Sequence, residues 1–68
     1  MTKILIVEDD RELQEGLVFA LEGEGYSTRA VSGKEEAVRA AALDNYSLMI
    51  LDCNLPDGTG YEVCREVR

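Results

Sequence analysis

Three carboxylates directly follow short apolar runs of the chain, and their types and spacing suit them to chemistry. Glu8 and Asp9 come after the run at 4–7, and Asp52 comes after the run at 48–51. A continuous apolar run this short predicts a strand that is buried on both faces. In open α/β sheets, ligands bind beyond the carboxyl ends of the strands. If these two strands are neighbours, the three carboxylates meet at one edge of the sheet.

Carboxylates gathered in this way need a compensating charge, because like charges repel. A hard divalent cation supplies that charge, and Mg²⁺ in particular accepts one or two carboxylates together with a carbonyl and several waters. Such a site leaves a coordination position for a phosphoryl oxygen. The alternative is that acids after strands only cap helices and face solvent. We favour that alternative for Asp10 but not for the other three, because Asp52 ends a strand and does not start a helix.

The rest of the pattern predicts the elements that must position these residues. We expect strands at 3–7, 26–31 and 48–51, and helices at 11–22, between Ser32 and Asp44, and after the turn at 56–60. Asp9 or Asp10 can cap the first helix, and the pairs Asp9 with Glu12 and Ser32 with Glu35 have the spacing of capping boxes. Each helix has an apolar stripe: Leu13, Leu17, Ala20 and Leu21, then Val38, Ala41 and Ala42, then Val63 and Val67. This β-α-β-α-β-α order predicts the α/β class, with parallel strands and right-handed crossovers.

Composition limits the function further. The chain has 68 residues, which is one domain at most, and its 7 basic and 14 acidic residues give a net charge of −7. We therefore expect this segment to contact neither nucleic acid nor an anionic membrane, because both contacts need clustered cations. No apolar run is long enough for an export signal or a membrane span, which predicts a cytoplasmic location. The chain contains no His, and we interpret Cys53 and Cys64 as reduced thiols without a metal role.

Two stretches of the chain resemble the receiver domain of two-component response regulators: Ile4-Leu5-Ile6-Val7-Glu8-Asp9-Asp10 and Leu51-Asp52-Cys53-Asn54-Leu55-Pro56-Asp57-Gly58-Thr59-Gly60. The resemblance covers residues 1–68 and implies the N-terminal portion of a flavodoxin-like, doubly wound parallel sheet with strand order 2-1-3. It implies that Asp52 is the phosphoacceptor and, with Asp9, a Mg²⁺ ligand. Glu8 would hold the metal through water, and the main-chain carbonyl of Asn54 would be a further ligand. Pro56 and Gly58 would shape the following loop.

The resemblance also implies partners and a limitation. A sensor histidine kinase would donate the phosphoryl group, a C-terminal effector domain could follow, and the chain itself would not be an enzyme. The family's fourth strand ending in Ser or Thr, and the Lys after its fifth strand, have no counterpart here. We therefore expect this segment not to switch fully, and we expect its third strand to be an apolar edge through which the segment self-associates.

Three other functions use residues of similar types. A haloacid dehalogenase-type phosphohydrolase would match Asp57-Gly58-Thr59, but its nucleophile would have to stand where Leu55 is. A dinucleotide-binding module needs a glycine-rich turn after the first strand, and the turn here is acidic. The alternative that stays open is a receiver-like interaction module that never carries phosphate.

Overall fold

A three-stranded parallel sheet in the order β2-β1-β3 forms the centre of the molecule. The computed structural model describes residues 2–52 and 54–67. The strands are β1 (Lys3–Val7), β2 (Ser27–Val31) and β3 (Leu48–Leu51). Val7 lies opposite both Val31 and Leu51, so the three strands end at the same level. The predicted α/β class and the 2-1-3 order are both confirmed.

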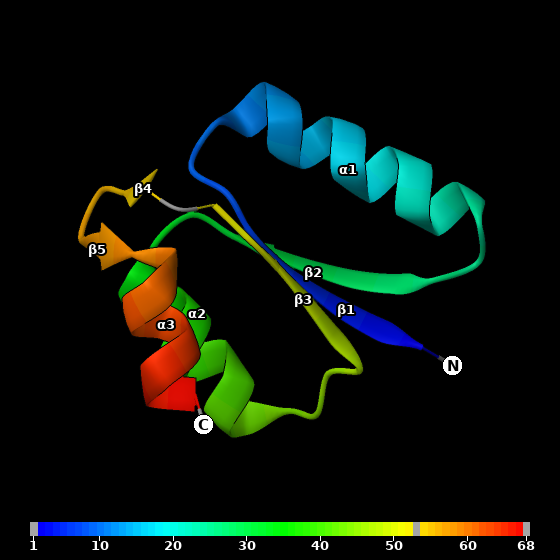
Figure 1. Ribbon diagram of the computed structural model, residues 1–68. Coiled ribbons are helices and arrows are strands. Elements are labelled where there is room, and N and C mark those ends of the chain that lie inside the picture. Colours follow the sequence, from blue (N-terminus) through cyan, green and yellow to red (C-terminus); the bar gives the residue numbers. More distant parts are fainter. Residues whose placement is uncertain (1, 53, 68) are drawn as a thin grey trace.

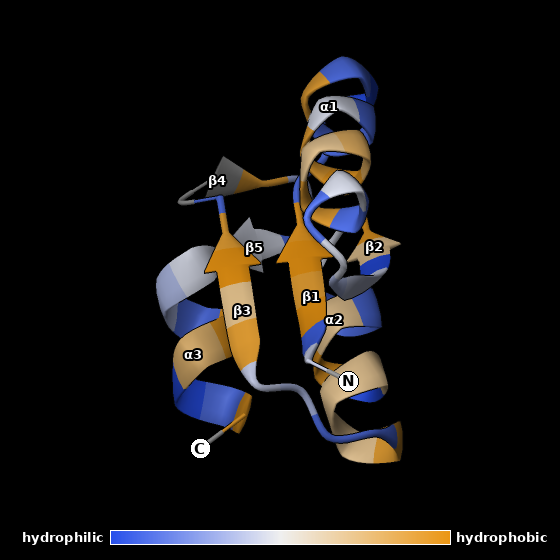
Figure 2. Cartoon of the chain, turned by 90° about the vertical axis from the view of Figure 1, so that its right-hand side faces the viewer, coloured by the Kyte–Doolittle hydropathy of each residue, from blue (hydrophilic) through white to orange (hydrophobic). Residues whose placement is uncertain are grey.

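Helices cover the two faces of this sheet. α1 (Arg11–Gly23) lies on one face, whereas α2 (Lys34–Leu43) and α3 (Gly60–Val67) lie on the other (Figure 1). Apart from Lys3 at the start of β1, the residues of β1 and β3 are apolar, and Figure 2 shows both strands as mainly hydrophobic, as strands between two layers must be. Within the described part of the chain, no helix is long and apolar enough to cross a membrane.

The core lies between the sheet and the α2–α3 layer. Its buried members come from both strands and helices: Leu5, Val7, Val31, Ala37, Ala40, Leu55 and Val63. The apolar stripe predicted for α2 is wrong in part: Ala41 packs against the core and Val38 is half-buried, but Ala42 is exposed, and the buried residues of the helix are Ala37 and Ala40. No residue of α1 is buried, and its Leu13 and Phe19 are 59% and 84% exposed. Leu17, Val18 and Leu21 of α1 are half-buried, and Ile4 and Ile6 of β1 are buried although they alternate with the core residues Leu5 and Val7. α1 therefore covers its face of the sheet in part, and the end of its apolar stripe at Leu13 is left exposed.

A short antiparallel hairpin, β4 (Asn54–Leu55) and β5 (Gly58–Thr59), follows the third strand. The sequence predicted only a turn over 56–60, and this prediction is wrong in part: the turn is Pro56-Asp57, and Gly60 already begins α3. A hairpin with two residues in each strand is marginal by itself. It forms here because Leu55 enters the core at 9% exposure.

The helix caps differ from the predicted capping boxes. Of the two predicted candidates, Asp10 caps α1, and its Oδ1 accepts hydrogen bonds from the amides of Glu12 and Leu13 at 3.0 and 3.2 Å. Gly33, not Ser32, is the N-cap residue of α2 and makes no side-chain bond.

The cap of α2 comes from far along the sequence. The Asp57 carboxylate accepts hydrogen bonds from the amides of Lys34 and Glu35 at 2.6 and 3.1 Å. These bonds also lower the pKa of Asp57, because amide donors favour its charged form. A true capping box opens α3, where Thr59 and Glu62 each accept from the other's amide at 3.1 and 3.0 Å.

Candidate metal centre

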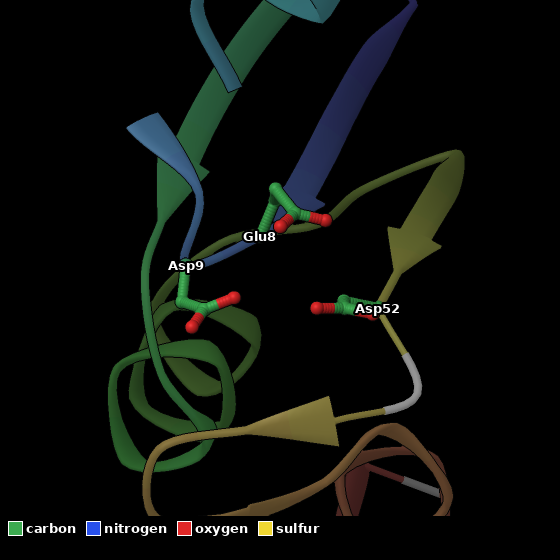
Figure 3. Close-up of side chains that lie close together, drawn as sticks. All are labelled: Glu8, Asp9 and Asp52. Carbon is green, nitrogen blue, oxygen red and sulfur yellow. The ribbon is translucent and has the colours of Figure 1, made fainter. Parts of the chain in front are cut away.

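Three carboxylates converge where β1 and β3 end. One oxygen each from Glu8, Asp9 and Asp52 lies within 4.8 Å of the other two. Figure 3 shows the three side chains pointing toward a common space, two from the end of β1 and one from the end of β3. Glu8 and Asp52 are half-buried, and Asp9 is exposed. The convergence that the sequence predicted is therefore observed.

The sheet itself fixes the backbone under these residues. The amide of Asp52 donates to the carbonyl of Val7 at 2.9 Å, and the amide of Glu8 donates to the carbonyl of Val31 at 3.0 Å. Both bonds continue the ladders of the parallel sheet beyond the last paired residues. Glu8 and Asp52 consequently follow their strands at the same level.

The turn from β1 into α1 holds Glu8 further. The amide of Asp10 donates to Oε1 of Glu8 at 3.0 Å. The side-chain amide of Gln14 donates to the carbonyls of Glu8 and Val31 at 2.9 and 3.1 Å. Reasoning from the sequence missed Gln14, because a lone polar residue beside an apolar stripe resembles a residue that faces solvent.

The geometry suits a divalent cation. Two oxygens bound to one octahedral Mg²⁺ at about 2.1 Å are about 3 Å apart when adjacent and about 4.2 Å apart when opposite. Oxygens within 4.8 Å of one another therefore need only a small movement, or one bridging water, to share an ion. All three donors are hard carboxylate oxygens, which Mg²⁺ and Ca²⁺ prefer to nitrogen or sulfur.

Both lysines are engaged away from the three carboxylates. Lys3 pairs with Asp44 at the opposite end of the sheet. The ammonium of Lys34 lies 3.5 Å from Glu66 and 3.7 Å from Glu62, and these two acids raise its pKa. Lys34 thus connects α2 to α3.

The remaining predicted site residues lie in the loop after Asp52. Asn54 begins β4 and pairs with Thr59, and the role of its carbonyl as a metal ligand stays a prediction. Cys53 lies outside the described residues.

Gly58 permits a close approach of the α2 side chain Lys34 to the loop, because a Cβ at Gly58 would lie 2.5 Å from Cδ of Lys34. The sequence predicted that Gly58 and Pro56 shape this loop. The lack of space for a Cβ gives a steric reason for glycine at position 58, whereas Pro56 is exposed in the turn.

Comparisons with known proteins agree with this fold. Residues 4–68 match the family model of the response regulator receiver domain. The transcriptional regulatory protein PmrA of Pectobacterium parmentieri is 50% identical over 58 residues, covering 85% of this chain and 26% of that protein. The transcriptional regulatory protein BasR of Escherichia coli is 41% identical over 66 residues, covering 97% of this chain and 30% of that protein. The chain thus spans less than a third of the length of these relatives.

Solved structures show the same similarity. The response regulator TrrA of Thermotoga maritima, in complex with Mg(2+)-BeF, superposes with a TM-score of 0.95 at 38% identity and covers all of this chain and 59% of that chain. A complex of TrrA with the histidine kinase ThkA gives a TM-score of 0.93 over the same share of both chains. Sheet order, acid placement and sequence agree, and the chain belongs to the response regulator receiver domain family.

Proposed function

We propose that this chain accepts a phosphoryl group on Asp52 in a reaction that requires Mg²⁺. The observation that carries the proposal is the meeting of Glu8, Asp9 and Asp52 within 4.8 Å at the carboxyl edge of the sheet. The Mg(2+)-BeF complex of TrrA supports it, because the similarity to TrrA covers all of this chain. Asp9 and Asp52 would ligate the ion directly, with Glu8 acting through water and the carbonyl of Asn54 completing the protein ligands.

The chemistry follows from charge and position. A carboxylate oxygen of Asp52 attacks the phosphorus of a phosphohistidine, a new P–O bond forms, and the P–N bond breaks. The electron pair returns to the imidazole nitrogen of the donor, which then takes up a proton. Such transfers depend mainly on positioning and charge stabilisation. A bound Mg²⁺ would neutralise the phosphoryl oxygens, which the acids would otherwise repel.

The partner in this proposal is a sensor histidine kinase, for which the complex of ThkA with TrrA provides the precedent. The product is the phosphorylated chain itself, so the chain is a phosphoacceptor and not an enzyme. A cytoplasmic location suits such an exchange and suits relatives that are named as transcriptional regulators. An effector domain after this segment would supply the output, and this segment, with its net charge of −7, would not touch DNA.

Phosphorylation with acetyl phosphate tests the proposal. Intact mass spectrometry should show one added phosphoryl group with Mg²⁺, none with EDTA, and none in Asp52→Asn. Asp44→Asn is the matched control, because it removes the same charge at the opposite end of the sheet, where Asp44 pairs with Lys3. Labelling that persists in Asp52→Asn would refute the assignment of the acceptor.

The interaction module without phosphate is the second candidate, and the open edge of β3 favours it. Among the described residues β3 pairs only with β1, and Leu48 on it is 55% exposed. Under this alternative, the chain binds a protein partner equally well before and after treatment with acetyl phosphate. A chain that takes no label, yet self-associates through β3, would favour this candidate over phosphoryl transfer.

A further inference from the structure

Several hydrogen bonds hold the turn that carries Glu8 and Asp9. Glu8 is held at three atoms: its amide donates to Val31, its carbonyl accepts from Gln14 at 2.9 Å, and its Oε1 accepts from the amide of Asp10 at 3.0 Å. Asp10 in turn caps α1, the helix that carries Gln14. The contacts therefore form a ring from Glu8 through Asp10 and α1 to Gln14 and back to Glu8.

Gln14 is the only side chain in this ring that reaches across to two strands. A side-chain amide has two protons to donate. The carbonyls of Glu8 and Val31 lie at 2.9 and 3.1 Å and take both of them, whereas the hydroxyl of Ser32 is more distant at 3.5 Å. The backbone amide of Gln14 also donates to the carbonyl of Asp10 at 2.9 Å. One residue thus ties the ends of β1 and β2 to the first turn of α1.

We infer that Gln14 is a positioning residue for the metal centre, acting on Glu8 through the backbone. This inference rests on the proposed function. The three carboxylates repel one another, so a loose turn lets Glu8 and Asp9 move away from Asp52. With the Glu8 peptide held, the acids are already gathered when the cation arrives, and binding needs less rearrangement.

Gln14→Met tests the inference. Methionine is close to glutamine in size, is uncharged and forms helices well, but it cannot donate a hydrogen bond. Loss of the tether should raise the Mg²⁺ dissociation constant about fivefold, the factor that corresponds to one hydrogen bond of about 1 kcal/mol. The dissociation constant is measured by calorimetric titration, and stability is measured by urea unfolding in EDTA.

Thr28→Val is the matched control. The hydroxyl of Thr28 donates to Oε2 of Glu22 at 2.9 Å, which ties the other end of α1 to β2. Both variants remove a side-chain hydrogen bond between α1 and β2 without changing charge, and only Gln14→Met also removes the bond to the carbonyl of Glu8. We expect Thr28→Val to leave the dissociation constant within about twofold of the wild type, while its stability falls in the same way as that of Gln14→Met.

A measurement on the unaltered chain keeps the inference testable if Gln14→Met does not fold. The two side-chain amide protons of Gln14 should have separate NMR signals and should shift with Mg²⁺ at the same midpoint as the amides of Glu8 and Asp9. Signals from Gln14 that stay fixed during the titration, or a Gln14→Met variant that binds as tightly as the wild type, would overturn the inference. Absence of Mg²⁺ binding by the wild type would instead overturn the proposed function.

Discussion

Replacing Asp52 with Asn should change stability in opposite directions without and with Mg²⁺. Without the cation, Asp52 repels Glu8 and Asp9 in the folded chain, and this repulsion disappears on unfolding because Asp52 is remote from them in sequence. Asp52→Asn removes the repulsion and keeps the side chain's size. With the cation, the wild type gains binding energy that the variant largely loses.

The magnitude follows from the separation of the carboxylates. Two unit charges 4.8 Å apart interact by about 0.9 kcal/mol at the dielectric constant of water and by about 3.5 kcal/mol at an effective value near 20. Asp9 is exposed and the other two are half-buried, so the lower figure applies more closely. Two such pairs give Asp52→Asn about 2 kcal/mol of extra stability in EDTA. A Mg²⁺ concentration of about a hundred times the dissociation constant stabilises the folded wild type by about 2.7 kcal/mol.

Urea unfolding in EDTA and in saturating Mg²⁺ measures both effects. Asp52→Asn should be the more stable protein in EDTA, and its advantage should vanish or reverse in Mg²⁺. Asp44→Asn is the control: it loses an ion pair with Lys3, so it should be the less stable protein in both solutions. An Asp52→Asn variant that gains nothing in EDTA, or that Mg²⁺ stabilises as much as the wild type, would show that the three acids do not form one cation site.

Three further predictions concern the fold around the site. Val63 is fully buried, so Val63→Ala should lower the free energy of unfolding by about 2 kcal/mol in a urea titration, and an unchanged midpoint would contradict the described core. Two backbone amides lower the pKa of Asp57 from 3.8. The charged carboxylate therefore stabilises the fold above pH 3.8, and this stabilisation is lost as the pH falls below that value. Asp57→Asn should flatten the acid side of the stability profile, measured by denaturation between neutral pH and about pH 3, whereas an unchanged slope would show that the cap contributes nothing. Leu48→Lys places a charge on the open edge of β3 and should reduce self-association in sedimentation velocity; a wild type that stays monomeric at every concentration would refute association through this edge.

The sequence predicted the positions of the three carboxylates well. A continuous apolar run of this length favours a buried strand, and the bounds of β1 and β3 agree with those expected. Parallel strands with in-register ends then bring the following acids together. The location of Glu8, Asp9 and Asp52 is thus a consequence of strand pattern and topology alone.

Contacts between residues distant in sequence were not predictable in the same way. The cap of α2 comes from Asp57, 23 positions after Lys34, and no local pattern indicates such a donor–acceptor pair. Amphipathic spacing marked the apolar face of α1, but it does not reveal whether another layer covers that face, and Leu13 is mostly exposed. The role of Gln14 likewise depends on where the ends of β1 and β2 lie relative to α1.

A crystal structure of the chain grown with Mg²⁺ would show whether the three carboxylates share one ion. We expect one octahedral ion, bound at about 2.1 Å by carboxylate oxygens of Asp9 and Asp52 and by the main-chain carbonyl of Asn54, with waters in the remaining positions, one of them next to Glu8. An ion bound elsewhere on the surface, or these carboxylates turned apart with no shared ion at saturating Mg²⁺, would contradict it.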